Sequence, residues 1–284
     1  MELNELKNFL NRIQKEKGTQ WYDTLTERKR KESEFHDDTR DLKIRGSLSD
    51  DEYQIRHGNR KFYDIIGPQK EYINNWRQKR MPGKVFLDYA CGNGREAIKA
   101  AKAGSALSIG IDISDVSINN AKKRAIEEGV SEKCVFIQSD CENTGLPDES
   151  IDVILCSGML HHLDLSYAFP ELRRILKTGG HILAVEALNY NPIFKLYRVS
   201  TPEQRTEWEK AHILSNKDIR FAERFFEISD IRFWHLMVLF AVFLPKSKIT
   251  DLVEDFLHGI DNLLMRIPYI KWLGWQFTFE LGKK

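Results

Sequence analysis

Short apolar runs and helical periods alternate along the middle of the chain. Apolar runs predict five strands, at residues 84–90, 106–114, 134–140, 151–159 and 181–188. Apolar residues at helical spacing predict helices between them, at residues 94–104, 115–130 and 168–180. Alternation of this kind is typical of βαβ units, in which helices cover both faces of a parallel sheet. The middle of the chain therefore predicts a doubly wound α/β fold.

The pattern changes on either side of this alternating region. Residues 1–80 are charged and helical in character, and residues 191–284 combine aromatic side chains with helical periods. The chain closes with GWQFTFELGKK, whose alternation predicts an edge strand. We therefore expect three parts: an N-terminal helical lid or substrate segment at 1–80, a ligand-binding core at 81–190, and an insert with closing strands of the same domain at 191–284.

The longest apolar run is FWHLMVLFAVFL, at residues 233–244. It is shorter than the roughly 18–20 residues that a membrane-spanning helix needs. We expect a buried helix or strand pair here. The alternative is an interfacial segment that takes a lipid-like ligand from a membrane surface, with nearby basic and tryptophan side chains at the boundary.

Composition narrows the class of partner. The chain has 43 Lys and Arg against 42 Asp and Glu, so its net charge of +1 does not favour nucleic acid as a partner. The four cysteines form no CxxC pair, which indicates reduced thiols and no metal site. The N-terminal residues predict a polar amphipathic helix in place of a signal peptide. We expect a cytoplasmic protein, with peripheral membrane contact as the alternative.

A glycine-containing turn follows the first predicted strand, in the stretch LDYACGNG at residues 87–94. Such a turn lies at the carboxyl end of the strand, where doubly wound sheets bind ligands. Gly92 and Gly94 let the backbone approach a ligand and adopt positive φ without steric cost. With Ala97 they also fit the dinucleotide pattern GxGxxG/A, so the glycines alone leave the ligand open.

Asp88 favours one of these ligands. A pyrophosphate binds bare N–H groups at a helix N-terminus, and a carboxylate beside it would repel it. Asp88 with small residues at 90, 92 and 94 suits a ligand that carries an ammonium group. The stretch resembles motif I of the class I S-adenosylmethionine-dependent methyltransferases, (D/E)xGxGxG, with Ala90 in place of the first glycine.

The resemblance continues at the next three strand ends. After the second strand, Asp112 corresponds to the acid that binds the ribose hydroxyls, and Ile113 would lie against the adenine. After the third, Asp140 and Cys141 occupy the positions that hold the adenine amino group. After the fourth, Ser157 lies at the edge of the cofactor. Residues 60–190 carry this likeness.

The resemblance implies a fold and an activity. The fold is a Rossmann-like, mainly parallel seven-stranded sheet with N-terminal helices and a helical, aromatic insert before the last strands. The activity is transfer of a methyl group from S-adenosylmethionine to a small-molecule or lipid-like acceptor, by in-line displacement at oxygen, nitrogen or carbon, leaving S-adenosylhomocysteine. Two alternatives remain open: a nicotinamide-dependent oxidoreductase, and a non-catalytic protein that binds the cofactor on the same fold.

Histidines are the candidates for a general base. His161 and His162 follow the fourth strand, and a similar pair follows it in the related ubiquinone- and sterol-type methyltransferases. His36 stands beside Asp37, which could orient it as a base. The plainer alternatives are a helix cap or ordered loop for the pair, and a solvated helix face for His36.

Residues outside the core would select the acceptor. The resemblance implies that Tyr63 closes over the cofactor. Arg198, Arg205 and His212 lie where polar and aromatic residues interleave, and they could anchor a carboxylate or phosphate of the acceptor.

Overall fold

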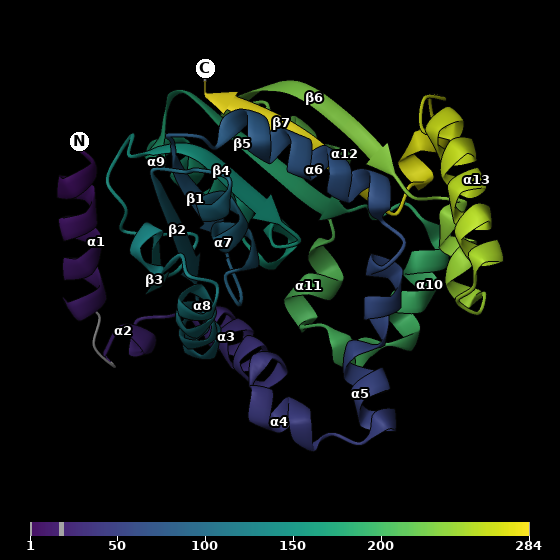
Figure 1. The fold of residues 1–284 in the computed structure, drawn as a ribbon, viewed down its shortest axis with the longest axis horizontal. Coiled ribbons are helices and arrows are strands. Elements are labelled where there is room, and N and C mark those ends of the chain that lie inside the picture. Colours follow the sequence, from purple (N-terminus) through teal and green to yellow (C-terminus); the bar gives the residue numbers. More distant parts are fainter. Residues whose placement is uncertain (1, 17–19, 284) are drawn as a thin grey trace.

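One seven-stranded sheet forms the centre of the molecule, in the order β3-β2-β1-β4-β5-β7-β6 (Figure 1). The computed structural model describes residues 2–16 and 20–283. The strands are β1 (Val85–Tyr89), β2 (Leu107–Asp112), β3 (Cys134–Gln138), β4 (Ile151–Ser157), β5 (Leu176–Ala187), β6 (Phe226–Trp234) and β7 (Gln276–Lys283). β1 to β5 pair in parallel, and β7 runs antiparallel to both of its neighbours. The predicted doubly wound, mainly parallel sheet is confirmed.

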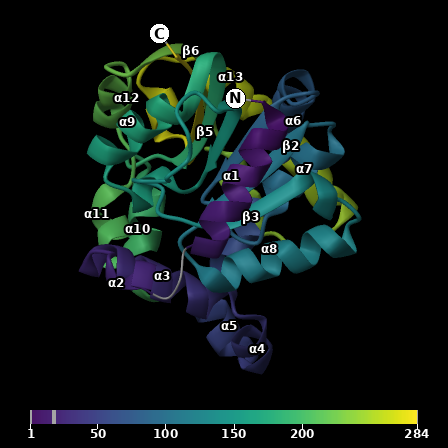
Figure 2. The same cartoon turned by 90° about the vertical axis from the view of Figure 1, so that its left-hand side faces the viewer.

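Helices cover both faces of this sheet (Figures 1 and 2). The α-helices are α1 (Leu3–Glu16), α2 (Gln20–Asp23), α3 (Glu27–Arg40), α4 (Leu42–Ser47), α5 (Asp50–His57), α6 (Gly67–Arg80), α7 (Arg95–Lys102), α8 (Asp115–Glu127), α9 (Leu165–Ile175), α10 (Pro192–Ser200), α11 (Glu207–His212), α12 (Asn216–Ala222) and α13 (Lys248–Leu264). The 3-10 helices are η1 (Gly58–Tyr63), η2 (Ser131–Lys133), η3 (Leu160–His162), η4 (Pro202–Gln204), η5 (Val238–Phe243) and η6 (Ile270–Leu273).

The alternation of side chains along the strands explains the two layers. In β1, Val85, Leu87 and Tyr89 belong to one apolar cluster and Phe86 to the other. Side chains of α6, α7 and α8 complete the cluster around Phe86, and side chains of α1, α9 and α12 complete the opposite one. Because successive strand residues point to opposite faces, a strand buried on both faces is apolar throughout.

Local signals set the boundaries of α8 as the sequence predicts. The side chain of Ser114 accepts a hydrogen bond from Ser117 N at 3.0 Å, which satisfies one of the free N–H groups of the first turn. Gly129 follows the helix with a φ of 68°. Glycine adopts this left-handed conformation without strain, and helices commonly end there.

The C-terminal segment differs from its prediction as an edge strand. β7 lies between β5 and β6, and β6 forms the edge. Residues from Gln276 to Leu281 are buried, including the polar ones. Polar side chains of β7 can be buried where they have partners in the sheet. For example, the indole nitrogen of Trp234 donates a hydrogen bond to the Thr278 hydroxyl at 3.1 Å.

The apolar run at 233–244 is only partly buried. It crosses the end of β6 and continues through η5, where Val238, Leu239 and Ala241 are buried and Phe240 and Phe243 are exposed. Further exposed apolar side chains lie on α13, at Ile249, Leu252, Phe256 and Leu263. Within residues 2–16 and 20–283, no helix combines the length and apolar content required to cross a bilayer.

The N-terminal helices reach the carboxyl ends of the strands. α3, α4 and α5 form an arc beneath these strand ends, with α11 on the inner side (Figure 1). α3 packs beside α8, where Asn120 Nδ2 donates to the carbonyl of Arg40 at 3.1 Å. This arrangement brings α3 against the edge of the sheet where a doubly wound fold binds its ligand.

Candidate active site

The turn after β1 depends on three left-handed residues. Ala90, Gly92 and Gly94 have φ values of 61°, 50° and 71°. A Cβ placed on Gly94 would lie 2.7 Å from Ala121 Cβ and 2.8 Å from Phe136 Cε1, so only glycine fits there. Ala90 is a non-glycine residue in a conformation that disfavours a side chain, at the position where the motif has glycine. The turn therefore keeps its shape at a cost in backbone strain.

Asp88 supports this turn from behind. Its side chain is buried, and its Oδ2 accepts a hydrogen bond from Ala97 N at 3.0 Å in the first turn of α7. Burial, with a contribution from the nearby Glu96, raises the pKa of Asp88 to about 8. Asp88 does not line either cavity described below. Its predicted contact with an ammonium group remains a prediction.

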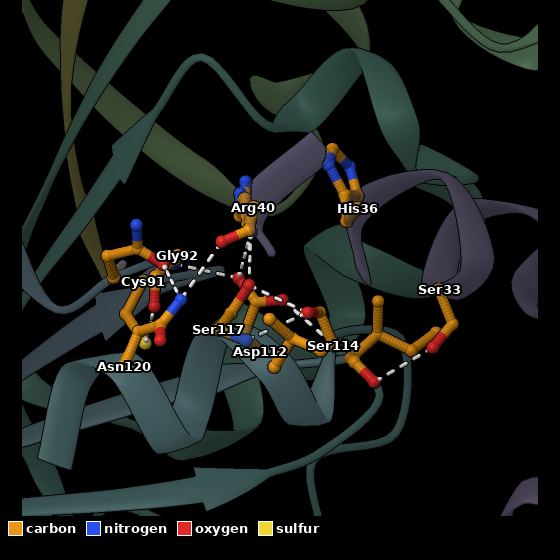
Figure 3. A network of polar contacts seen from close by, with 12 residues as sticks. Ser33, His36, Arg40, Cys91, Gly92, Asp112, Ser114, Ser117 and Asn120 are labelled. Atoms are coloured by element: carbon orange, nitrogen blue, oxygen red, sulfur yellow. Dashed lines mark hydrogen bonds and ion pairs between the residues drawn. The ribbon is translucent and has the colours of Figure 1, made fainter. Parts of the chain in front are cut away.

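Asp112 joins the turn to the ligand side of the sheet. Its Oδ2 accepts from Gly92 N at 2.7 Å, and its Oδ1 accepts from Ser114 N at 2.9 Å. Arg40 reaches from α3 onto the same carboxylate, with Nη1 3.1 Å from Oδ2 (Figure 3). Asp112 is buried and lines the first cavity, so its oxygens are held in place at the end of β2.

A cavity of about 140 Å³ lies between these strand ends and α3. Six residues predicted to bind the cofactor line it together: Ala90, Asp112, Ile113, Asp140, Cys141 and Ser157. They come from the ends of β1, β2, β3 and β4, which the parallel sheet brings to one edge. The structure therefore brings these six residues together, and their role in binding a cofactor remains a prediction.

Three cations of α3 close this cavity over three acids. Arg28 Nη2 lies 2.5 Å from Glu142 Oε1, Lys29 Nζ lies 2.6 Å from Asp140 Oδ2, and Arg40 binds Asp112. The sequence analysis missed all three cations. For Lys29 and Arg40 the signal was helical spacing, because they share one helix face with Ser33 and His36. The Ser33 hydroxyl donates to the carbonyl of Ile113 at 3.2 Å (Figure 3).

A second cavity, of about 420 Å³, adjoins the first. The two share four lining residues: His36, Arg40, Gly158 and His162. The other lining residues of the second cavity come from α3, α4, α5, η1, η3, η4, α11, the end of β5 and the start of β7. The turn after β1 contributes Asn93 and Gly92, so Gly92, predicted to bind the cofactor, lies in this second cavity. Small-molecule sites usually enclose about 300–1,000 Å³, so the second cavity reaches this size by itself.

His161 faces this second cavity and is fixed from behind. Its Nδ1 donates to Glu186 Oε2 at 2.6 Å. Glu186 is fully buried, and its Oε1 accepts from Met159 N and Leu160 N at 2.8 and 2.7 Å. The other imidazole nitrogen, Nε2, lies 3.8 Å from Glu209 Oε1. Burial by itself would lower the pKa of His161, but the Glu186 carboxylate outweighs it and holds this pKa above its ordinary value.

His162 and His36 gather around a different carboxylate. His162 Nδ1 lies 2.9 Å from Glu32 Oε2, and His36 Nε2 lies 3.8 Å from the same oxygen. Burial and the positive charge of Arg40 hold the pKa of His36 well below its ordinary value.

The expected orientation of His36 by Asp37 is wrong. Asp37 Oδ1 accepts from Ser114 Oγ at 2.6 Å and from Val116 N at 3.2 Å. These contacts tie α3 to the start of α8 and leave Glu32 as the carboxylate beside His36. Adjacent residues of a helix project in different directions, which explains why the sequence neighbour is not the partner.

Other predicted site residues lie away from the first cavity. Tyr63 lines the second cavity, and its ring centroid is 5.2 Å from that of Trp275. Arg205 pairs with Glu209 at 3.4 Å, and His212 stacks on Trp208 with centroids 3.7 Å apart. Arg198, Arg205 and His212 line neither cavity.

Comparison with known proteins agrees with the architecture. Residues 87–184 match the family described as "Methyltransferase domain". This stretch of the chain is therefore similar to methyltransferase domains. The matched stretch contains the turn after β1, the acids at the end of β2 and just after β3, and His161. Glu186 lies two residues beyond its end, in β5.

Two curated relatives of this chain are methyltransferases by name. The chain is 35% identical over 101 residues to 27-O-demethylrifamycin SV methyltransferase of Amycolatopsis mediterranei, covering 35% of this chain and 37% of that protein. It is 34% identical over 144 residues to demethylmenaquinone methyltransferase of Bacteroides fragilis, covering 44% and 58%. The chain thus spans less than two thirds of the length of these curated relatives.

A solved structure extends the likeness to most of the fold. Geranyl diphosphate C-methyltransferase from Streptomyces coelicolor superimposes with a TM-score of 0.57 at 13% identity, covering 91% of this chain and 99% of that one. At this identity the match establishes the fold of the methyltransferase domain and its surroundings, and the chemistry has to be argued from the site.

Proposed function

We propose that this protein transfers a methyl group from S-adenosylmethionine to a small-molecule acceptor. The proposal rests above all on the first cavity, where six residues from four strand ends meet at the edge of a class I methyltransferase domain. When bound there, the cofactor would supply an electrophilic methyl group on a sulfonium. The protein's own residues would bind the cofactor, hold the acceptor and take up a proton.

The donor set of the first cavity fits this cofactor. Asp112 and Asp140 offer carboxylate oxygens to hydroxyl and amino groups, and Ile113 and Cys141 offer apolar surface to a base. A nicotinamide dinucleotide would place a pyrophosphate near these carboxylates, which is unfavourable. Arg40 and Lys29 now bind the same acids, so they have to release them when the cofactor enters.

His161 is the residue that we propose as the general base. Glu186 holds its Nδ1–H, so the lone pair of Nε2 points to the acceptor side, where it can accept a proton. Glu186 acts through His161 and is a positioning residue. His162 and His36 form the wall between the two cavities, and their catalytic role remains a prediction.

The acceptor would be bound by parts outside the matched domain. We keep the division at 1–80, 81–190 and 191–284 as a proposal, because the second cavity takes its outer walls from the first and last of these parts. A lipid-like acceptor is favoured by the exposed apolar side chains of η5 and α13, such as Phe243, Leu252 and Phe256. Sedimentation with liposomes tests this: membrane contact predicts binding that Phe243→Ser with Phe256→Ser abolishes.

Calorimetry tests the cofactor. We expect S-adenosylhomocysteine to bind with submicromolar to micromolar affinity, and NAD not to bind. Asp112→Ala should weaken this binding by about 1.5–3 kcal/mol, as expected for lost charge-assisted hydrogen bonds. Asp115→Ala is the matched control, because Asp115 is exposed and lines neither cavity. NAD binding without S-adenosylhomocysteine binding would instead support an oxidoreductase.

Turnover separates an enzyme from a binding protein. Purified protein is incubated with S-adenosylmethionine and a panel of small acceptors, and S-adenosylhomocysteine is quantified. Product formation that depends on both acceptor and protein supports methyl transfer. Tight cofactor binding with no product across the panel would favour the non-catalytic alternative.

A further inference from the structure

The second cavity is rich in cationic side chains. Arg40, Arg45 and Arg56 line it, and the one carboxylate among its lining residues is that of Glu209. Glu209 is paired with Arg205 at 3.4 Å. Arg40 is paired with Asp112. Arg45 and Arg56 therefore have no carboxylate partner among the lining residues of this cavity.

Arg45 and Arg56 come from two short helices that follow α3. Arg45 Nη2 donates to the hydroxyl of Tyr53 at 2.9 Å, and its guanidinium lies 5.4 Å from the Tyr53 ring centroid. Neither arginine has a carboxylate within ion-pair distance in the part of the chain that the structure describes. Glu52, one turn before Arg56, accepts instead from Ser49 N and Oγ at 2.9 and 2.8 Å.

An unsatisfied amide lines the same cavity from the sheet. Gln276 begins β7 and is 7% exposed. Its Oε1 is buried and has no hydrogen-bond partner within residues 2–16 and 20–283. A buried polar atom without a partner is unfavourable, so such atoms are rare unless a ligand or water completes them. Gln276 therefore points to a polar group that occupies this cavity.

We propose that the acceptor carries an oxyanion, a carboxylate or a phosphate, which Arg45 and Arg56 bind in the second cavity. Guanidinium groups bind carboxylates and phosphates through paired hydrogen bonds, so two of them suit this group. Gln276 binds a polar group elsewhere on the acceptor. His161 lines the same cavity, which places the acceptor's reacting atom within its reach. This inference depends on the proposed function only in that the bound molecule is called an acceptor.

The ligand chemistry can be tested with three probes of similar size. Phenyl phosphate, benzoate and neutral benzyl alcohol are titrated into the full-length protein, and binding is followed by ligand-observed nuclear magnetic resonance. We expect at least one of the two anions to bind about tenfold or more tightly than benzyl alcohol. Preference for phenyl phosphate identifies a phosphate ester, and preference for benzoate identifies a carboxylate. Equal binding of all three overturns the proposal.

Substitutions of Arg45 and Arg56 test whether the anion binds at these two arginines. Arg45→Gln with Arg56→Gln should weaken the preferred anion about tenfold or more, and the exposed Arg56→Gln alone should weaken it severalfold if the pair does not fold. Arg266→Gln, an exposed arginine at the end of α13, should change nothing. Retained anion binding in the double variant overturns the proposal.

A second measurement separates this inference from the proposed function. S-adenosylhomocysteine should bind the double variant with the affinity of the original protein, because neither arginine lines the first cavity. If the original protein binds the anion but not S-adenosylhomocysteine, the proposed function fails and the anion site stands. If it binds S-adenosylhomocysteine but no anion, the reverse holds.

Discussion

The two cavities of this protein share a wall and differ in origin. The first is built from strand ends of one βαβ series, inside residues 87–184 that match the methyltransferase domain. The second takes most of its lining from α3, α4, α5, η1, α11 and β7, which lie outside that range. The first cavity is thus formed by the sheet of the matched domain, and the second is formed mainly by helices outside that domain.

Their charges differ in the same way. The strand ends contribute acids to the first cavity, and α3 covers these acids with cations. The second cavity has arginines and a single, already paired carboxylate. Under the proposed function, the common sheet would bind the cofactor and the added helices would bind the acceptor.

The largest expected effect separates the two cavities by function. His161→Ala should lower the methyl-transfer rate by about 10²–10⁴-fold, because it removes the proposed general base. Affinity for S-adenosylhomocysteine should stay within about twofold, since His161 lines only the second cavity. His181→Ala removes another carboxylate-paired histidine, in the middle of β5, and should leave the rate unchanged. Loss of cofactor affinity in His161→Ala would contradict the separation.

The second largest expected effect concerns the stability of the turn after β1, beside the first cavity. Gly94→Ala should lower the free energy of unfolding by about 2–4 kcal/mol, because the new Cβ clashes with Ala121 and Phe136 and also meets a left-handed backbone. Gly129→Ala shares the left-handed φ and has open space around it, so it should cost about 1 kcal/mol. Urea denaturation measures both. Equal costs would mean that packing around the turn contributes nothing.

The pH dependence of catalysis tests how Glu186 acts on His161. A general base must be neutral, so the rate should fall as pH drops below the pKa of His161, which lies above its ordinary value. Glu186→Gln removes the charge that raises this pKa and should shift the midpoint to lower pH by about one unit. The pH profile of kcat/KM provides the measurement. An unchanged midpoint would mean that Glu186 only orients the ring.

A substitution of Arg40 tests the role of the residues that line both cavities. Arg40→Gln removes the cation that now binds Asp112, and we expect S-adenosylhomocysteine affinity to rise about two- to fivefold, the scale of a partly exposed ion pair. Arg124→Gln breaks an ion pair with Glu128 on α8 and is the control. Calorimetry decides the sign. Weaker binding would mean that Arg40 contacts the cofactor after it enters.

The smallest effect concerns the irregular residue of the turn. Ala90→Gly relieves a left-handed alanine but adds freedom to the unfolded chain, so it should stabilise the protein by only about 0.5 kcal/mol. Ala103→Gly, at a residue with a φ of −77°, should destabilise it. Thermal unfolding distinguishes the two signs. A destabilising Ala90→Gly would show that the Ala90 side chain contributes packing in the first cavity.

Local sequence patterns predict much of the structure around the first cavity. The strands, the cap at Ser114 and the turn around Gly92 follow from residues close together in sequence. The parallel order of the strands then gathers Asp112, Asp140 and Ser157 at one edge, because each of them lies at or just after the carboxyl end of a strand. A chain that alternates strands and helices leaves few other arrangements.

Contacts between residues far apart in the chain could not be predicted from the sequence. His161 was a candidate base, but its partner Glu186 became visible only when β4 and β5 paired with Ser157 opposite Val185. The chain end that alternates like an edge strand became an inner strand, because β6 pairs with it from the other side. Neither register nor edge position is encoded in a local period.

The sequence by itself determined the doubly wound sheet, the glycine turn and the acids at the strand ends, since each is a property of a short stretch. Tertiary structure alone decided that α3 covers those acids with Arg28, Lys29 and Arg40, and that Arg45, Arg56 and Gln276 surround one cavity. The physical reason is that a helix docks by matching whole surfaces. The residues that meet across such an interface lie far apart in the chain and carry no shared local pattern.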